Sequence, residues 1–183
     1  MSSVIHRLAR IAVVLFAALP LQPAWAGCTL VHGHGRNHDP RDEAANRQWD
    51  ALNRRFHQAV MERLAQAGWT LDGLWLGVAE TDLQANAQRL LDQARERGCT
   101  RVLDGTVFAE PAQGLLILRL RLHPLLQAQG PLRPGLPPRI GEPIYQSRRE
   151  LALEPRVLER LALGSGVEAL AHAMAEELAA AQP

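Results

Sequence analysis

The chain of 183 residues has no lysine, two cysteines and four serines, and these shortages exclude several chemistries. A P-loop needs a lysine to hold nucleotide phosphates, so this type of nucleotide site is excluded. The two cysteines form no Cys-x-x-Cys motif, which argues against a thioredoxin-like redox role. No serine lies in a Gly-x-Ser-x-Gly nucleophile elbow, and no His-Glu-x-x-His motif occurs. The sequence therefore predicts that the protein is not an enzyme.

The chain also lacks an apolar run of the roughly 20 residues that a membrane-spanning helix needs, so we expect no transmembrane span. The N-terminal apolar run, Ile11–Leu19, is only nine residues long and follows two arginines. Behind it, Ala24-Trp25-Ala26 has the small-x-small pattern that signal peptidase requires. We therefore predict a signal peptide over residues 1–26 and a mature protein that begins near Gly27.

Cys28 lies directly behind this cleavage site, and three fates are open to it. An oxidising compartment favours a disulfide between Cys28 and Cys99, which would stabilise the fold by roughly 4 kcal/mol. Ala26-Gly27-Cys28 also matches the end of a bacterial lipobox, although Trp25 stands where an aliphatic residue is usual, so a lipid anchor is the alternative. A free buried thiol is the third. The expected location is the periplasm, or the membrane surface if the protein is a lipoprotein.

Size and charge indicate one compact domain without a nucleic-acid partner. About 157 residues follow residue 26, enough for one domain with its own core, which we predict over residues 27–183. The formal net charge of the chain is +1, and it falls to −1 without the two arginines of the expected signal peptide. This balance argues against a generic nucleic-acid binder.

Apolar periodicity alternates between strand and helix patterns along the domain. Strands are predicted over Cys28–His32, Trp69–Ala79, Thr100–Glu110, Leu115–His123 and Ile144–Leu153. Helices are predicted over Asp42–Ala67, from Thr81 to Gly98, behind Pro155 and from Ser165 onward, with Gly68 and Gly98 as C-terminal caps. Together these elements predict an α+β fold in which a mixed sheet of four or five strands packs against about three helices.

Three local signals refine this prediction. Capping boxes at Thr81–Gln84 and Ser165–Glu168 mark the starts of the second and last helices. Leucines alternate with arginines along Leu115–His123, so the leucines should face the core. Residues 124–143 hold half of the prolines and form a long loop, which is either a recognition segment or a plain connection.

One cluster of histidines has the composition of a metal site. His32 and His34 point the same way on an extended segment, and His38 can fold back across the glycines between them. With Cys28 or Asp39 these residues offer three or four ligands for Cu(II) or Zn(II). The alternative is an exposed arm whose histidines bind nothing specific. No other cofactor is expected.

Arginines supply the candidate partner-binding residues: Arg119, Arg121, Arg133 and Arg139. The first two lie on the strand over Leu115–His123, and Arg148 and Arg149 on the next strand can extend them into a basic stripe. Such a stripe can dock an acidic partner or an anionic polymer. It can equally be an ordinary solvated sheet face, paired with nearby glutamates.

The string Gly98-Cys99-Thr100-Arg101-Val102-Leu103-Asp104-Gly105-Thr106-Val107 follows an alanine- and leucine-rich helix. It resembles the passage "alanine-rich helix, Gly-Ala-Asp-Tyr-Val-Leu-x-Gly-x-Val" of a group of bacterial envelope proteins. The group includes the TolB amino-terminal domain, the curli-secretion CsgG lipoproteins and the LpoB activators of penicillin-binding proteins. The resemblance implies a domain that binds protein partners and has no enzymatic activity. Within the string, Asp104-Gly105 is expected to be structural, since glycine permits close approach in a strand.

The preferred hypothesis is therefore an exported periplasmic accessory protein that binds an envelope protein partner in envelope assembly or secretion. The first alternative is a periplasmic metal-binding protein that uses His32, His34 and His38. A periplasmic inhibitor or immunity protein is the second. An enzyme with an unrecognised site is the third.

Overall fold

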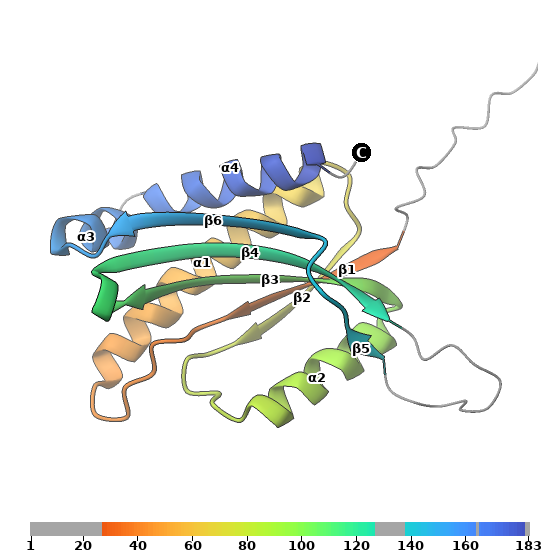
Figure 1. Cartoon of the computed structure of the whole chain (residues 1–183), viewed down its shortest axis with the longest axis horizontal. Helices are drawn as coiled ribbons and strands as arrows, with labels where there is room; N and C mark the ends of the chain where they lie inside the picture. The colour runs from red at the N-terminus through yellow and green to blue at the C-terminus, as the bar shows by residue number, and fades with distance from the viewer. Residues whose placement is uncertain (1–26, 127–137, 164, 182–183) are drawn as a thin grey trace, which may run out of the picture.

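The computed structural model describes residues 27–126, 138–163 and 165–181. Over these residues the chain has an α+β fold, with four α-helices and a mixed sheet of six strands (Figure 1). The predicted class and the mixed sheet are confirmed, with one strand more than expected and with helices at all four predicted places. The expected signal peptide over residues 1–26 lies outside the described residues.

The elements follow the predicted order. The strands are β1 (Cys28–His34), β2 (Leu71–Leu76), β3 (Cys99–Glu110), β4 (Leu115–Leu126), β5 (Arg139–Ile140) and β6 (Tyr145–Ala152). The helices are α1 (Glu43–Gln66), α2 (Leu83–Glu96), α3 (Pro155–Leu163) and α4 (Gly166–Ala181), and a short 3₁₀ turn, η1 (Pro111–Gln113), joins β3 to β4. Gly68 and Gly98 have φ of 84° and 65°, a left-handed conformation that suits glycine, and they end α1 and α2 as predicted.

The order of the strands decides where the helices lie. β1 lies inside the sheet, parallel to its neighbours β2 and β3. β4 is antiparallel to β3, and both β5 and β6 pair with β4. The crossover from β1 to β2 and the crossover from β2 to β3 run in opposite directions across the sheet. Because parallel crossovers are right-handed, α1 and α2 fall on opposite faces.

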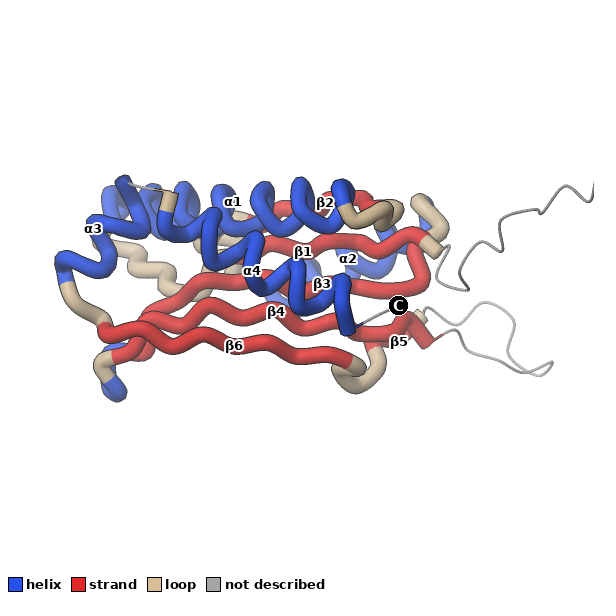
Figure 2. The backbone as a smooth tube through the Cα atoms, turned by 90° about the horizontal axis from the view of Figure 1, so that it is seen from above, coloured by secondary structure: helices blue, strands red, loops and turns tan. Residues whose placement is uncertain are grey.

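The main core lies between one face of the sheet and the three helices α1, α3 and α4 (Figure 2). Phe56 of α1 and Met174 of α4 are fully buried in this layer. They pack in one apolar cluster with four leucines of β4: Leu116, Leu118, Leu120 and Leu122. The prediction that the leucines of this strand face the core is confirmed.

The opposite face is covered only in part. α2 packs there on β1, β2 and the first half of β3, and a smaller core lies beneath it: Leu30, Leu74, Leu76, Leu90, Ala94, Cys99 and Val102. No described helix covers the second half of β3, β4 or β6 on this side (Figure 1). We call this area the open half-face. On β4, Arg119 and Arg121 alternate with the buried leucines and therefore lie on the open half-face. Phe108 and Arg148 lie on it too, because they are the cross-strand partners of Ile117 and Arg119.

The predicted loop over residues 124–143 is wrong at both of its ends. β4 continues to Leu126, and Arg139–Ile140 pairs back onto it as β5, with Ile140 opposite Leu125. A two-residue ladder among prolines has no periodicity to detect, which is why the sequence does not predict it. Arg133 lies outside the described residues.

The two predicted capping boxes also differ from the observed contacts. Asp82, not Thr81, caps α2, because its Oδ1 accepts the backbone N–H groups of Gln84 and Ala85 at 3.0 Å each. A carboxylate at this position also interacts favourably with the helix dipole. At α4, the Glu168 carboxylate accepts two hydrogen bonds from Arg55 of α1, at 2.6 and 2.8 Å.

Cys28 and Cys99 stand opposite each other where two parallel strands begin, and their sulfur atoms lie at disulfide distance. This pairing indicates a compartment that oxidises thiols. Within the described ranges, no helix combines the length and apolar character needed to cross a membrane.

Candidate functional site

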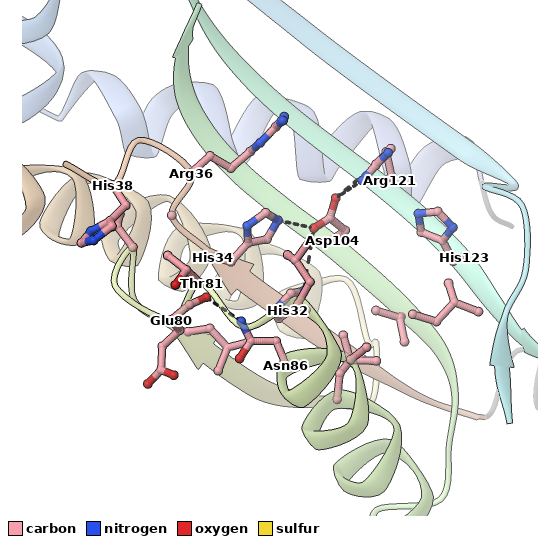
Figure 3. A pocket seen from close by; sticks show the side chains of 18 residues that line it. His32, His34, Arg36, His38, Glu80, Thr81, Asn86, Asp104, Arg121 and His123 are labelled. Carbon is pink, nitrogen blue, oxygen red and sulfur yellow. Dashed lines mark hydrogen bonds and ion pairs between the residues drawn. The ribbon is translucent and has the colours of Figure 1, made fainter. Parts of the chain in front are cut away.

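A pocket of about 520 Å³ lies between α2 and the sheet, at the border of the open half-face (Figure 3). Side chains of β1, β3 and β4 form its floor, and α2 with the turn before it forms one wall. Ile140 of β5 closes the opposite side. The pocket therefore exists because α2 covers only part of its face.

Asp104 is the centre of the polar floor. It is buried on β3, and strand register places it between His32 of β1 and Arg121 of β4. Its Oδ1 accepts a hydrogen bond from His34 Nε2 at 2.9 Å, and its Oδ2 accepts Arg121 Nη2 at 2.7 Å and Nε at 3.1 Å. Arg119 Nη2 lies 3.6 Å from the same Oδ2. The carboxylate of Asp104 thus faces two imidazoles with one oxygen and two guanidiniums with the other.

The carboxylate of Asp104 stays ionised in this setting. Burial alone would raise the pKa of Asp104, but the hydrogen bonds and charges of His34 and Arg121 outweigh burial and hold that pKa well below its usual range. The ionised group is therefore a permanent anchor for the histidines and arginines around it.

His32 is the most enclosed histidine of the floor. Its ring stacks on His34 with 5.0 Å between centroids, and its Nδ1 lies 3.8 Å from Asp104 Oδ1. Burial, and then the neighbouring His34, lower the pKa of His32 to about 4, so the ring is neutral at pH 7. Its buried Nε2 has no hydrogen-bond partner within the described part of the chain.

Close packing from α1 keeps these two histidines in line. A Cβ on Gly33, which separates them, would come within 2.6 Å of Cδ2 of His57 and 2.9 Å of Cε3 of Trp75. Glycine is therefore required at this position, because β1 passes directly under the helix. The strand beneath the histidines is fixed by the core and not by the pocket.

The structure brings together only part of the predicted metal cluster. His32 and His34 lie side by side, while His38 is exposed and lines the pocket outside their group. Asp39 faces α1, where its backbone contacts Asn46. Cys28 lies beside Cys99. The third potential ligand is Asp104, for which the sequence predicts a structural role.

The predicted arginine stripe is divided between two faces. Arg119 and Arg121 gather on Asp104, and Arg148 lies on the same face, paired with Glu150 at 2.8 Å. Arg149 points to the other face and contacts Glu177 of α4. Arg139 is exposed on β5. The stripe is therefore a cluster around one carboxylate rather than a row along a solvated strand.

Asp104 could have been recognised from one signal. It is a carboxylate inside the apolar stretch Val102–Phe108, where an unpaired charge would be costly. Such a residue calls for a buried cationic partner, and the arginines between the leucines of the next strand are the candidates. The strand register that unites them cannot be taken from spacing alone.

Apolar side chains form the rims of the pocket. Leu83 at the start of α2 is 83% exposed and Ile140 is 42% exposed, and both line the pocket. Leu126, which follows the Ile140 partner Leu125 on β4, is exposed as well, and so is Ile144, whose N–H bonds the carbonyl of Leu122. Exposed large apolar residues on both sides of a polar floor are typical of a surface that another molecule covers.

Guanidinium groups exceed carboxylates on the adjoining open half-face. Arg36 and Arg119 stack on the Phe108 ring, with Cζ 4.3 and 5.4 Å from its centroid. Burial lowers the pKa of Arg119, Asp104 opposes this effect, and the charges of Arg121, Arg36 and Arg148 lower it further. An added anion would relieve this crowding of like charges.

No protein-family model matches the chain, and no curated protein is significantly similar to it. The resemblance to bacterial envelope domains therefore stays a prediction. The geometry of the pocket has to carry the functional argument.

Proposed function

We propose that the chain is an exported, non-catalytic accessory protein of the bacterial periplasm, and that it binds an envelope protein partner through the pocket and the open half-face. The observation that carries the proposal is the pairing of exposed apolar rims, Leu83 and Ile140, with the arginines Arg36 and Arg121 that line the same pocket. The Cys28–Cys99 pair supports export, since disulfides persist mainly outside the cytosol.

The chemistry of the surface specifies the kind of segment that fits it. The apolar rims favour a partner side chain of similar character. Arg36 and Arg119 favour a neighbouring carboxylate, because Asp104 is already engaged by Arg121 and His34. Arg36 has no carboxylate partner among the described residues. The proposed ligand is therefore a protein segment that presents an apolar residue next to an acidic one.

Site-specific crosslinking in intact cells tests this proposal. A photoreactive amino acid is placed at Leu83 or at Ile140, with Ala65 on the far side of α1 as the control position. The same envelope protein should be captured from both rims and not from Ala65. Absence of an adduct at both rims, or the same adducts at all three positions, would overturn the proposal. Capture of an incoming toxin would replace the accessory role by that of an inhibitor.

A charge variant tests the acidic part of the partner. Arg36→Glu should reduce the yield of the rim adducts, because it places a carboxylate where an acidic group is expected. Arg47→Glu is the matched control, since Arg47 is an exposed arginine of α1 paired only with Glu43 among the described residues. Equal yields in the two variants would contradict a role for Arg36.

A further inference from the structure

Two histidines and one carboxylate lie close enough to share one ion. A ligand atom from each of His32, His34 and Asp104 lies within 4.8 Å of the other two. His32 and Asp104 are register partners on the parallel strands β1 and β3, and His34 follows on the same side of β1. The three groups are therefore held by the sheet and not by a mobile loop (Figure 3).

The two oxygens of Asp104 have different surroundings. Oδ1 faces the imidazoles, at 2.9 Å from His34 Nε2 and 3.8 Å from His32 Nδ1. Oδ2 faces the guanidiniums of Arg121 and Arg119. Ligating carboxylates are commonly fixed by a hydrogen bond to the second oxygen, and Arg121 makes this contact. Oδ1 is thus the oxygen left for an ion between the histidines.

The ring of His32 is fixed with one nitrogen toward Asp104 and the other without a partner in the described ranges. Its Nε2 is buried with no hydrogen-bond partner in the described ranges, although buried polar atoms are usually satisfied. An ion between the ring and Asp104 would bind the nearer nitrogen, Nδ1, and would give this enclosed ring a polar contact.

We propose that His32, His34 and Asp104 form a binding site for a divalent transition metal of the zinc class, with further coordination positions open to the pocket. Two imidazoles and one carboxylate suit Zn(II), Cu(II), Ni(II) or Co(II), whereas Mg(II) and Ca(II) prefer oxygen ligands throughout. On binding, the ion takes the place of the proton that His34 Nε2 donates to Asp104, and that proton moves by way of solvent to Nδ1 of the same ring. The site goes beyond the proposed partner binding and does not depend on it.

The neighbouring charges set the expected strength of binding. Arg121 and Arg119 touch the far side of Asp104, and Arg36 lies over Phe108 nearby. These cations oppose a second positive charge, so we expect micromolar rather than nanomolar affinity. The same cations can hold an anionic ligand against the metal, at the positions that the protein leaves open.

The site is tested by calorimetry. The exported protein is first treated with a chelator to remove metal and is then titrated with ZnCl₂. One ion per chain should bind. Loss of a second-shell contact typically costs about 10- to 100-fold in metal affinity, so His34→Ala and His32→Gln should weaken binding by at least that much. His38→Ala is the matched control, because His38 lines the same pocket outside the cluster, and it should leave the affinity unchanged.

Cobalt spectroscopy and a fold check complete the test. Co(II) should give visible absorption bands that His34→Ala abolishes, while circular dichroism confirms that the variant remains folded. Binding weaker than about 1 mM in the wild-type protein would overturn the site. Equal weakening by His38→Ala and His34→Ala would also overturn it, since it would indicate loose chelation by exposed histidines. Neither result would affect crosslinking at Leu83 and Ile140, so failure of this site and failure of the proposed function are distinguishable.

Discussion

His57 is held neutral inside the fold, although an exposed histidine takes up a proton near pH 6.5. Its ring lies between α1 and β1, and its Nε2 donates a hydrogen bond to the carbonyl of Val31 at 3.0 Å. Burial lowers the pKa of His57 more than this hydrogen bond raises it. Below about pH 6.5 the unfolded chain therefore binds a proton at this position and the folded chain does not. The free energy of unfolding consequently decreases as the pH is lowered.

His57→Gln should reduce this acid sensitivity. Glutamine can keep an N–H donor for the Val31 carbonyl but cannot take up a proton. Thermal melts between about pH 7.5 and pH 5 should show a smaller fall in Tm for the variant than for the wild-type protein. Parallel curves for the two proteins would contradict the burial of a neutral His57. His32 also contributes to the fall in Tm at low pH, but it is present in both proteins, so its contribution cancels when the two are compared.

Only some residues of the polar pocket floor can be predicted from the sequence. His32 and His34 are foreseen as a pair because alternate residues of a strand share a face. Asp104 is not, because its role depends on the register of two neighbouring strands. Gly105 beside it does have the predicted close packing: an added Cβ would lie 3.3 Å from Leu120.

Two asparagines complete the edge of β3 where β1 has ended. Asn53 of α1 donates Nδ2 to the carbonyl of Val107 at 2.9 Å and accepts the N–H of the same residue at 2.7 Å. Asn37 makes the same pair of bonds with Ala109, at 3.1 and 2.8 Å. Each side-chain amide thus replaces the backbone of a missing strand, which satisfies the edge without lengthening the sheet.

Asn53→Ala should destabilise the fold by about 2 to 3 kcal/mol, because it leaves a buried N–H and a buried C=O of Val107 unpaired. Asn37→Ala is the matched comparison. Asn37 is only partly buried, so water can replace its amide and the loss should be smaller. Chemical denaturation measures both variants. If Asn53→Ala costs no more than Asn37→Ala, the edge bonds of Val107 are not a significant source of stability.

Periodicity predicts the long elements well and the short contacts poorly. The stripes of α1 and β4 repeat over many residues, and their buried faces agree with the prediction. β5 has two residues, and the cap of α2 is decided between adjacent Thr81 and Asp82, so neither has a repeat to identify it. These local outcomes depend on hydrogen-bond geometry and hairpin closure rather than on composition.

For the molecule as a whole, the Cys28–Cys99 pair joins the N-terminal end of the domain to its centre. The two residues are 71 positions apart, so the bond would remove much of the freedom of the unfolded chain. Replacing both cysteines by serine should lower the free energy of unfolding by about 4 kcal/mol in urea denaturation. Equal stability of the wild-type and doubly substituted proteins would contradict a bonded pair.

Intact mass spectrometry separates the disulfide from the lipid anchor. The disulfide makes the mature chain lighter by two hydrogens than its reduced form, whereas acylation of Cys28 adds the mass of the acyl chains. We expect the lighter species, because Cys28 lies at disulfide distance from Cys99 and a cysteine in a disulfide cannot be acylated. A mass increase located at Cys28 would contradict the disulfide and place the protein among lipoproteins.

The interior position of β1 has a consequence for how the chain comes together in time. β1 is the first element to emerge when the chain is delivered N-terminus first, yet its partners β2 and β3 are complete only at Leu76 and Glu110. Before Leu76 is delivered β1 has no neighbour, and before Cys99 is delivered Cys28 has no thiol to meet. β1 therefore becomes an interior strand only after β3 has been delivered, so the sheet around it cannot be complete before residue 110. The sheet assembles late, around a strand that was made first.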